Sequence, residues 1–194
     1  MFSAHNVAIY IINWCLDHNV PITNLKLQKL LYFVQGEYSR VKGTRLIADD
    51  FYAWQLGPVV PNVYAEYSIF SSSALPSQKQ SISFDHEDRC VIDAILQKYA
   101  RYTTWNLVEL SHQQDPWKYQ HEIFGDKALI PFESIADYFG KDTIVLQSAK
   151  ATGYYPRKTG MDCYRRRYPY DNKPSYGAEN MENTKNQNTG YHRI

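Results

Sequence analysis

Apolar residues recur at three- and four-residue steps over residues 24–42, which is the spacing of one face of an α-helix. The apolar stripe consists of Leu27, Leu30, Leu31, Val34, Tyr38 and Val41. Thr23 stands where an N-cap hydroxyl is needed, and Gly43 stands where a residue that tolerates positive φ suits the end of a helix. The pattern therefore predicts a long helix with a well-defined start, end and buried face.

The remaining positions of this helix combine apolar and cationic side chains, namely Leu25, Tyr32, Phe33, Lys26, Lys29 and Arg40. Gln28 and Gln35 flank the apolar stripe two turns apart. A helix with apolar residues on both sides is either buried nearly all round by its own domain or offers a second face to a partner. Both interpretations are open from the sequence, and the first is the more common situation.

Other segments predict a mainly α-helical fold with a small β-hairpin. Helices are expected over residues 3–18, after Pro61, after an N-cap at Asp85, from Thr103 or Thr104 to His112, and over residues 132–139. Asp115 followed by Pro116 predicts another helix start with Asp115 as its N-cap. Residues 46–47 and 51–54 predict the hairpin strands, residues 57–61 a rigid connector, and residues 71–80 an exposed loop.

The composition changes after residue 140. Residues 141–194 are rich in Tyr, Arg and Asn, and apart from residues 144–146 they contain few aliphatic side chains. Such a segment cannot form a packed core, so we expect one compact domain over residues 1–140 and a disordered basic tail over residues 141–194. The formal charge is −4 for residues 1–140 and +5 for residues 141–194.

This charge distribution bears on nucleic-acid binding. An acidic domain argues against a dedicated nucleic-acid-binding fold, because phosphate contacts need clustered cations. In the tail, residues 165–167 are three arginines between Tyr164 and Tyr168. They could stack on RNA and neutralise its phosphates. A solvated basic tail without a specific partner is the more common alternative.

The sequence also indicates the cellular compartment. No apolar run approaches the roughly 20 residues of a membrane-spanning helix, and no secretory signal pattern opens the chain. The three cysteines are odd in number and widely spaced, so a disulfide framework is not expected. These features predict a cytoplasmic protein with no membrane partner.

Enzymatic motifs are missing from the sequence. It contains no glycine-rich phosphate loop, no nucleophile elbow and no metalloprotease spacing, so we expect neither an enzyme nor a cofactor. Cys15 with His18, and His86 with Cys90, could form a metal site from two helices, but they lack the usual loop spacing and buried Cys is more common.

Acid–base chemistry is the other conceivable use of histidine in this chain. His112, Asp115 and His121 lie near one another in sequence, and such groups can act as general acids or bases. Helix termination by His112 and capping by Asp115 are the more common roles. We therefore do not assign a catalytic site to them.

Three blocks, residues 22–36, 51–54 and 57–64, together resemble the Panacea antitoxin domain. That family includes SocA-like antitoxins and GepA-like phage-associated proteins. The resemblance covers roughly residues 4–140 and weakens after Tyr67. It implies a mostly helical bacterial antitoxin, encoded beside a toxin that it neutralises by direct binding. Some SocA-like members instead deliver the toxin to a cytoplasmic protease, and this adaptor role and a nucleic-acid-binding regulator remain the alternatives.

The matched blocks suggest which residues contact the toxin. The outward candidates on the central helix are Lys26, Lys29, Tyr32 and Gln35. The adjoining surface is assigned to Trp54, Gly57, Pro58 and Tyr64, for which structural roles are about equally common. If this surface is correct, changing Lys26 and Lys29 together to Glu weakens toxin binding and leaves the melting temperature nearly unchanged.

Overall fold

The computed structural model describes residues 1–140. The helices are α1 (Ala4–Asp17), α2 (Asn24–Lys42), α3 (Pro61–Glu66), the 3-10 helix η1 (Ser68–Phe70), α4 (His86–Tyr99), α5 (Thr104–His112), α6 (Asp115–Phe124) and α7 (Phe132–Gly140). The strands are β1 (Phe51–Trp54), β2 (Gly57–Val59) and β3 (Ala128–Ile130). The prediction of a mainly α-helical fold is confirmed.

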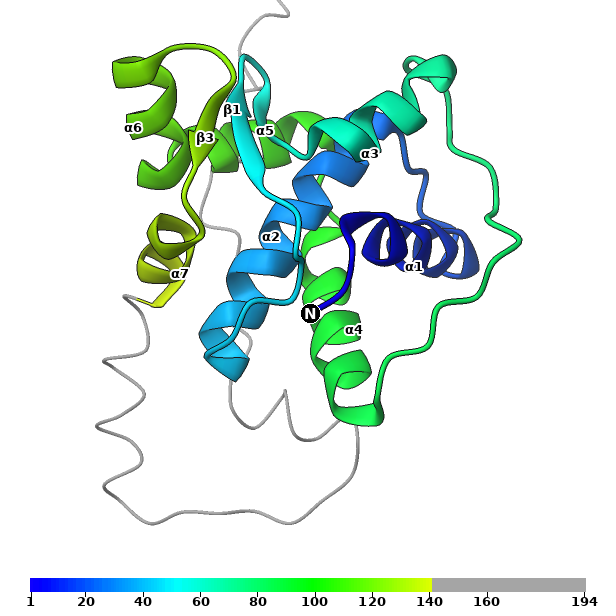
Figure 1. Cartoon of the computed structure of the whole chain (residues 1–194). Helices are drawn as coiled ribbons and strands as arrows, with labels where there is room; N and C mark the ends of the chain where they lie inside the picture. Colours follow the sequence, from blue (N-terminus) through cyan, green and yellow to red (C-terminus); the bar gives the residue numbers. More distant parts are fainter. Residues whose placement is uncertain (141–194) are drawn as a thin grey trace, which may run out of the picture.

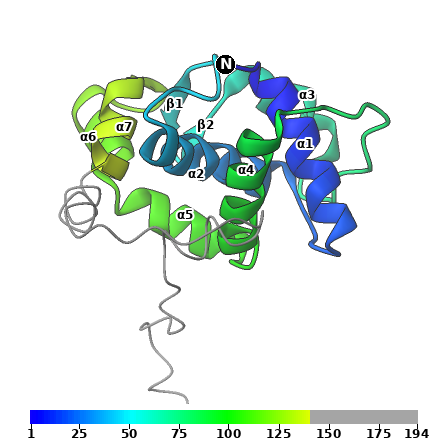
Figure 2. The ribbon, with the colours of Figure 1, turned by 90° about the horizontal axis from the view of Figure 1, so that it is seen from below.

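Helix α2 is the centre of this domain. It contacts α1, α3, α4, α5, α7 and β2, so that packed elements surround it (Figures 1 and 2). Every residue from Leu27 to Ser39 is buried. Of the two interpretations of its mixed surface, burial within its own domain is therefore the one that the structure supports.

The helix ends that polar residues predicted are confirmed. Thr23 Oγ1 accepts a hydrogen bond from Lys26 N at 3.3 Å, and Gly43 closes α2 with a φ of 70°. Asp85 caps α4 through a bond from Asp88 N at 2.8 Å, and Thr103 caps α5 through a bond from Asn106 N at 3.1 Å. Each cap supplies an acceptor to a backbone N–H that has no partner within its own helix.

The predicted hairpin is wrong in its pairing. β1 lies in the middle of a three-stranded antiparallel sheet of order β2-β1-β3, with Trp54 opposite Gly57 and Phe51 opposite Ile130. Leu46 and Ile47 pair instead with the start of the chain, where Phe2 N donates to Leu46 O at 2.7 Å. The segment 57–61 that was predicted as a connector thus begins with a strand. Pro58 is accommodated because β2 is an edge strand, which needs fewer N–H donors.

The start of α6 also differs from the prediction. Gln114 occupies the N-cap position and Asp115 is the first helical residue, so Asp115 does not cap the helix. β3, which follows α6, was not predicted. Its three residues are too few to show an alternating pattern, and its partner β1 lies far away in sequence.

Helix α7 closes the domain against α2 (Figure 1). The buried Ile135 and Phe139 form its inner face, as predicted. Phe139 lies over Gly36, where the Cβ of any larger residue would collide with the phenyl ring. The same ring contacts Tyr32 and Phe33, with centroid distances of 5.9 and 6.3 Å. Gly36 therefore provides the space that lets α7 approach the central helix.

Among residues 1–140, none of the helices is both long and apolar enough to cross a bilayer. The predicted basic tail, with its arginine cluster, lies outside the described residues. The division at residue 140 therefore remains a prediction.

Candidate functional site

The four outward candidates on α2 lie in the interior. The exposed fraction is 7% for Lys26, 0% for Lys29, 0% for Tyr32 and 1% for Gln35. Their outward orientation was inferred from their position off or beside the apolar stripe, and it is wrong. Lys26, Lys29 and Gln35 have hydrogen-bond partners inside the domain. The ring of Tyr32 packs against Phe33 and Phe51. A toxin cannot contact them on the folded surface.

Buried polar side chains of α2 bind the backbone of neighbouring loops. Gln28 Oε1 accepts from Val60 N at 3.0 Å, and Gln35 Oε1 accepts from Ile47 N at 2.7 Å. Asn24 Nδ2 donates to Tyr64 O at 2.9 Å. These bonds satisfy backbone groups that the sheet and α3 leave without partners. They fix the segments before β1 and after β2 onto the central helix.

The two lysines serve the same purpose. Lys26 Nζ donates to Ala100 O at 3.0 Å at the end of α4, and Lys29 Nζ donates to Pro58 O at 2.8 Å in β2. Burial lowers the pKa of both ammonium groups, and that of Lys29 falls well below its ordinary value. Hydrogen bonds from α2 thus join the block 22–36 to the block 57–64, and the block 51–54 is held beside them by the pairing of β1 with β2.

Gly57 lies directly against this buried lysine. Its φ is 100°, and a side-chain carbon there would come within 2.7 Å of Ser111 Oγ and 2.8 Å of Lys29 Nζ. Gly57 and Pro58 are buried, so they shape the surface from below and do not themselves contact a partner. Sequence analysis assigned both to the surface that adjoins the central helix, with a structural role as the alternative, and their burial favours that alternative.

His112 and His121 flank Trp117 and form a stack of three rings. The centroid distances are 3.9 Å from His112 to Trp117 and 4.7 Å from Trp117 to His121. Trp117 Nε1 donates to Trp54 O at 2.9 Å, which ties α6 to β1. The two histidines are therefore close in space as packing partners of a tryptophan.

We expect the domain to lose stability as the pH falls below about 6.5. Burial, then Lys29 and His121, lower the pKa of His112 from its ordinary 6.5. Between its lowered pKa and 6.5, the unfolded chain takes up a proton that the folded domain does not. The contribution of neutral His112 to the free energy of unfolding is therefore complete above pH 6.5. It is lost as the pH decreases from 6.5 through the lowered pKa of the folded state.

Urea unfolding at a series of pH values between 7.5 and 5 measures this effect. The matched control is His112→Phe, which keeps a ring beside Trp117 and cannot titrate. The wild-type unfolding midpoint should fall more steeply with pH than that of the variant. Parallel curves would contradict a role for His112.

Trp54 and Tyr64 remain as candidates at the surface. Both are half-buried, and their rings lie 5.0 Å apart between β1 and α3. Lys127 Nζ lies 5.4 Å from the centre of the Trp54 ring, and the neighbouring Leu56 is exposed. We name this group, Trp54, Tyr64, Leu56 and Lys127, the β1–α3 surface.

Two further residues of the site, Asn24 and Gln28, were not among the candidates. They are the buried residues that hold α3 and the backbone after β2. The sequence signal that could have indicated them is the spacing of two amide residues one helical turn apart. In the structure the two amide groups bond to each other at 3.2 Å. A pair of amides beside the apolar stripe of a helix favours buried hydrogen bonds to backbone.

The two Cys–His pairs that were considered as metal ligands do not assemble into a site in the part of the chain that the structure describes. Within residues 1–140, no three His, Cys, Asp or Glu side chains lie close enough to hold a metal ion. Cys15 is buried, and His18 stacks on Trp14 with a centroid distance of 3.9 Å. Cys90 Sγ lies 3.9 Å from His86 Nδ1 on α4.

Comparison with known proteins identifies the segment that contains this site. Residues 27–118 match the family model described as antitoxin SocA-like, Panacea domain. The chain is also 43% identical over 65 residues to the antitoxin SocA of Caulobacter vibrioides (strain NA1000 / CB15N). That match covers 34% of this chain and 35% of the relative, so it spans about a third of each protein. No solved structure shows significant similarity to the chain.

The family match covers most of the described site, although Asn24, Lys26 and Lys127 lie outside it. It runs from Leu27 on α2 through β1, β2 and α3 to the start of α6, and so includes Lys29, Gly57 and the Trp54–Tyr64 pair. Through residues 27–118, just under half of its length, this chain is therefore similar to the SocA-like Panacea domain family.

Proposed function

We propose that this protein is an antitoxin that neutralises a cognate toxin by direct binding. The observation that carries the proposal is the match of residues 27–118 to a SocA-like antitoxin domain, together with the identity to antitoxin SocA in Caulobacter vibrioides. We further propose that the toxin is encoded by an adjacent gene. Delivery to a protease and binding of nucleic acid are not favoured by any observation on residues 1–140.

We assign the β1–α3 surface to toxin contact. Trp54 and Tyr64 are aromatic, half-exposed and adjacent, and aromatic side chains in such positions commonly contribute most of the energy of a protein interface. The buried hydrogen bonds from Asn24, Gln28 and Lys29 fix the backbone beneath them. A surface that is already rigid loses less entropy on binding.

The ring-removing variants Trp54→Ala and Tyr64→Ala test this assignment. Their backbone oxygens, which accept from Trp117 and Asn24, remain in place, so the substitutions remove the rings and keep these bonds. The chain and the protein encoded beside its gene should be co-expressed, scored for growth and copurified. We expect a toxic neighbour, a stable complex, and affinity reduced at least about tenfold by each variant.

Trp105→Ala is the matched control, because Trp105 is a 65% exposed tryptophan on α5, a helix that contributes no residue to the β1–α3 surface. It should leave the affinity unchanged. A harmless neighbour that does not copurify would overturn the antitoxin proposal. A complex that tolerates both variants would overturn only the assigned surface.

A further inference from the structure

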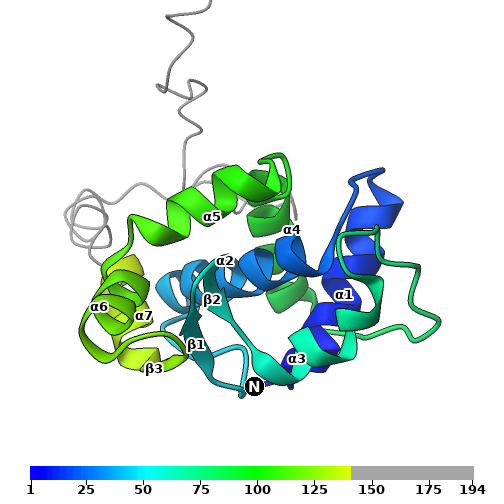
Figure 3. The ribbon, with the colours of Figure 1, turned by 90° about the horizontal axis from the view of Figure 1, so that it is seen from above.

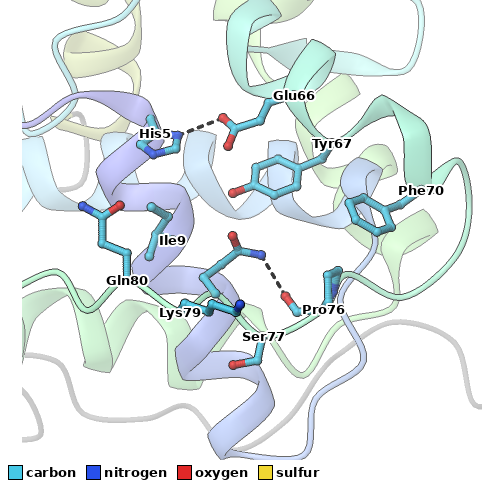
Figure 4. A pocket seen from close by; sticks show the side chains of 10 residues that line it. His5, Ile9, Glu66, Tyr67, Phe70, Pro76, Ser77, Lys79 and Gln80 are labelled. Atoms are coloured by element: carbon cyan, nitrogen blue, oxygen red, sulfur yellow. Dashed lines mark hydrogen bonds and ion pairs between the residues drawn. The ribbon is translucent and has the colours of Figure 1, made fainter.

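A hollow of about 470 Å³ opens between the start of α1, the α3–η1 segment and residues 76–80 (Figure 4). It borders α3, the same helix that carries Tyr64. Figure 3 shows α3 running beside α1. The volume of the hollow is within the usual range for ligand pockets. The β1–α3 surface and this hollow are therefore both bordered by α3.

The outer wall of the hollow is held in place at two points. Leu75 is buried, and its N–H donates to Ile22 O at 2.8 Å. Asn13 on α1 accepts from Gln78 N at 2.9 Å and donates to Gln80 O at 3.2 Å. Residues 76–80 are thus tied to the body of the domain on both sides. The prediction of an exposed loop over residues 71–80 missed this anchoring.

The Tyr67 hydroxyl is the most informative group in the hollow. Tyr67 is 3% exposed, and its buried hydroxyl makes no hydrogen bond of normal geometry. Burial and the Glu66 carboxylate raise its pKa to about 12, so the hydroxyl keeps its proton. Figure 4 shows it pointing toward α1 across the hollow. Its interaction with the Glu66 carboxylate falls outside that normal geometry, so an acceptor from a bound group would give this buried hydroxyl a better-formed hydrogen bond.

The charged groups around the hollow balance one another. Glu66 pairs with His5, with Oε2 and Nδ1 2.8 Å apart, and Lys79 is exposed at the rim. Gln78 Nε2 donates to Pro76 O at 2.8 Å, which leaves Oε1 as an acceptor. The apolar walls are formed by Ile9, Phe70 and Pro76. One hydroxyl donor, one amide acceptor and no net charge match an uncharged peptide group more closely than an anion or a cation.

We propose that this hollow binds an extended, uncharged peptide segment of the toxin. A carbonyl of the segment accepts a hydrogen bond from Tyr67, and an apolar side chain packs against Phe70 and Ile9. The naming of the toxin as the partner rests on the proposed function, whereas the peptide chemistry rests on the hollow itself.

The first experiment uses the free chain and needs no toxin. Three blocked peptides, acetyl-Ala-Leu-Ala-amide and the versions with Glu or Lys in the middle, are titrated while the backbone amide resonances of the protein are followed by NMR. We expect the neutral peptide to shift the amides of Tyr67, Phe70 and Gln78 most. Tyr67→Phe should weaken its binding about fivefold, since one hydrogen bond is lost.

Tyr67→Phe keeps the ring and removes a hydroxyl that makes no hydrogen bond of normal geometry, so its melting temperature should stay close to that of the wild type. Tyr102→Phe, which removes an exposed hydroxyl elsewhere, is the matched control and should bind like the wild type. Equal shifts from all three peptides, no shifts at these amides, or no effect of Tyr67→Phe would overturn the peptide site.

The second experiment tests the partner. In the complex with the neighbouring gene product, amide hydrogen exchange of residues 66–80 should slow, and Phe70→Ala should weaken the complex. A complex that forms with unchanged exchange in these residues would overturn the toxin as occupant while leaving the antitoxin function intact. If no complex forms, the antitoxin function and the toxin as occupant both fail, while the peptide titration still decides the site.

Discussion

Lys29→Glu should destabilise the domain by about 3–5 kcal/mol or prevent it from folding. Lys29 is fully buried, and its ammonium donates to the Pro58 carbonyl at 2.8 Å. A carboxylate in the same place cannot donate this bond and would bring an unpaired negative charge into the interior. Urea unfolding monitored by circular dichroism measures the loss.

Lys29→Met is the control for this substitution. Methionine has a similar length and no charge. It leaves the Pro58 carbonyl without its donor, which costs about 1–3 kcal/mol, but it avoids the desolvation that lowers the pKa of Lys29, which offsets part of that cost. Its stability should stay within about 1 kcal/mol of the wild type. A Lys29→Glu domain as stable as the wild type would place Lys29 at the surface, as polarity alone suggested, and would contradict the structure.

Gly57→Ala should cost about 3 kcal/mol, because it combines two unfavourable effects. A φ of 100° strains any residue with a side chain, and the added carbon would collide with Ser111 Oγ and Lys29 Nζ. The backbone of β2 would have to move, and with it the bond from Lys29 to Pro58. Denaturant unfolding of the purified variant measures the cost.

Gly125→Ala separates the two effects. Gly125 has a φ of 91° but nothing within 4 Å of the added carbon, so only the backbone strain remains. Its cost should be about 1 kcal/mol. Equal losses at Gly57 and Gly125 would show that Lys29 and Ser111 are not packed against Gly57.

The sequence predicted features that depend on local chemistry. Thr23, Asp85 and Thr103 mark helix starts because each hydroxyl or carboxylate caps a helix within three residues of itself. The apolar stripe of α2 could be recognised because burial repeats with the helical period. The family resemblance, carried by the three blocks, could be recognised for a different reason: their spacing follows from their packing onto one helix.

The candidate site was less predictable, because its polar residues have distant partners. Polarity predicts Lys29 and Gln35 at the surface, since polar side chains usually face water. Their actual partners are backbone groups at Pro58 and Ile47, and no local pattern reveals such contacts. The same reason explains why β3 was not predicted, because its partner β1 lies far away in the sequence. Tyr67 and the hollow likewise depend on three segments that meet only in the fold.

The contact between the Phe139 ring and Gly36 joins α7 to the part of the chain that matches the family model. The family match ends at residue 118, within α6, while β3 and α7 lie beyond it. Yet α7 covers Tyr32 and Phe33 on α2, and β3 completes the sheet beside β1. The C-terminal part of the domain is therefore not an interchangeable appendage. A homologue could exchange it only together with the small residue at position 36, so these two positions should vary as a pair.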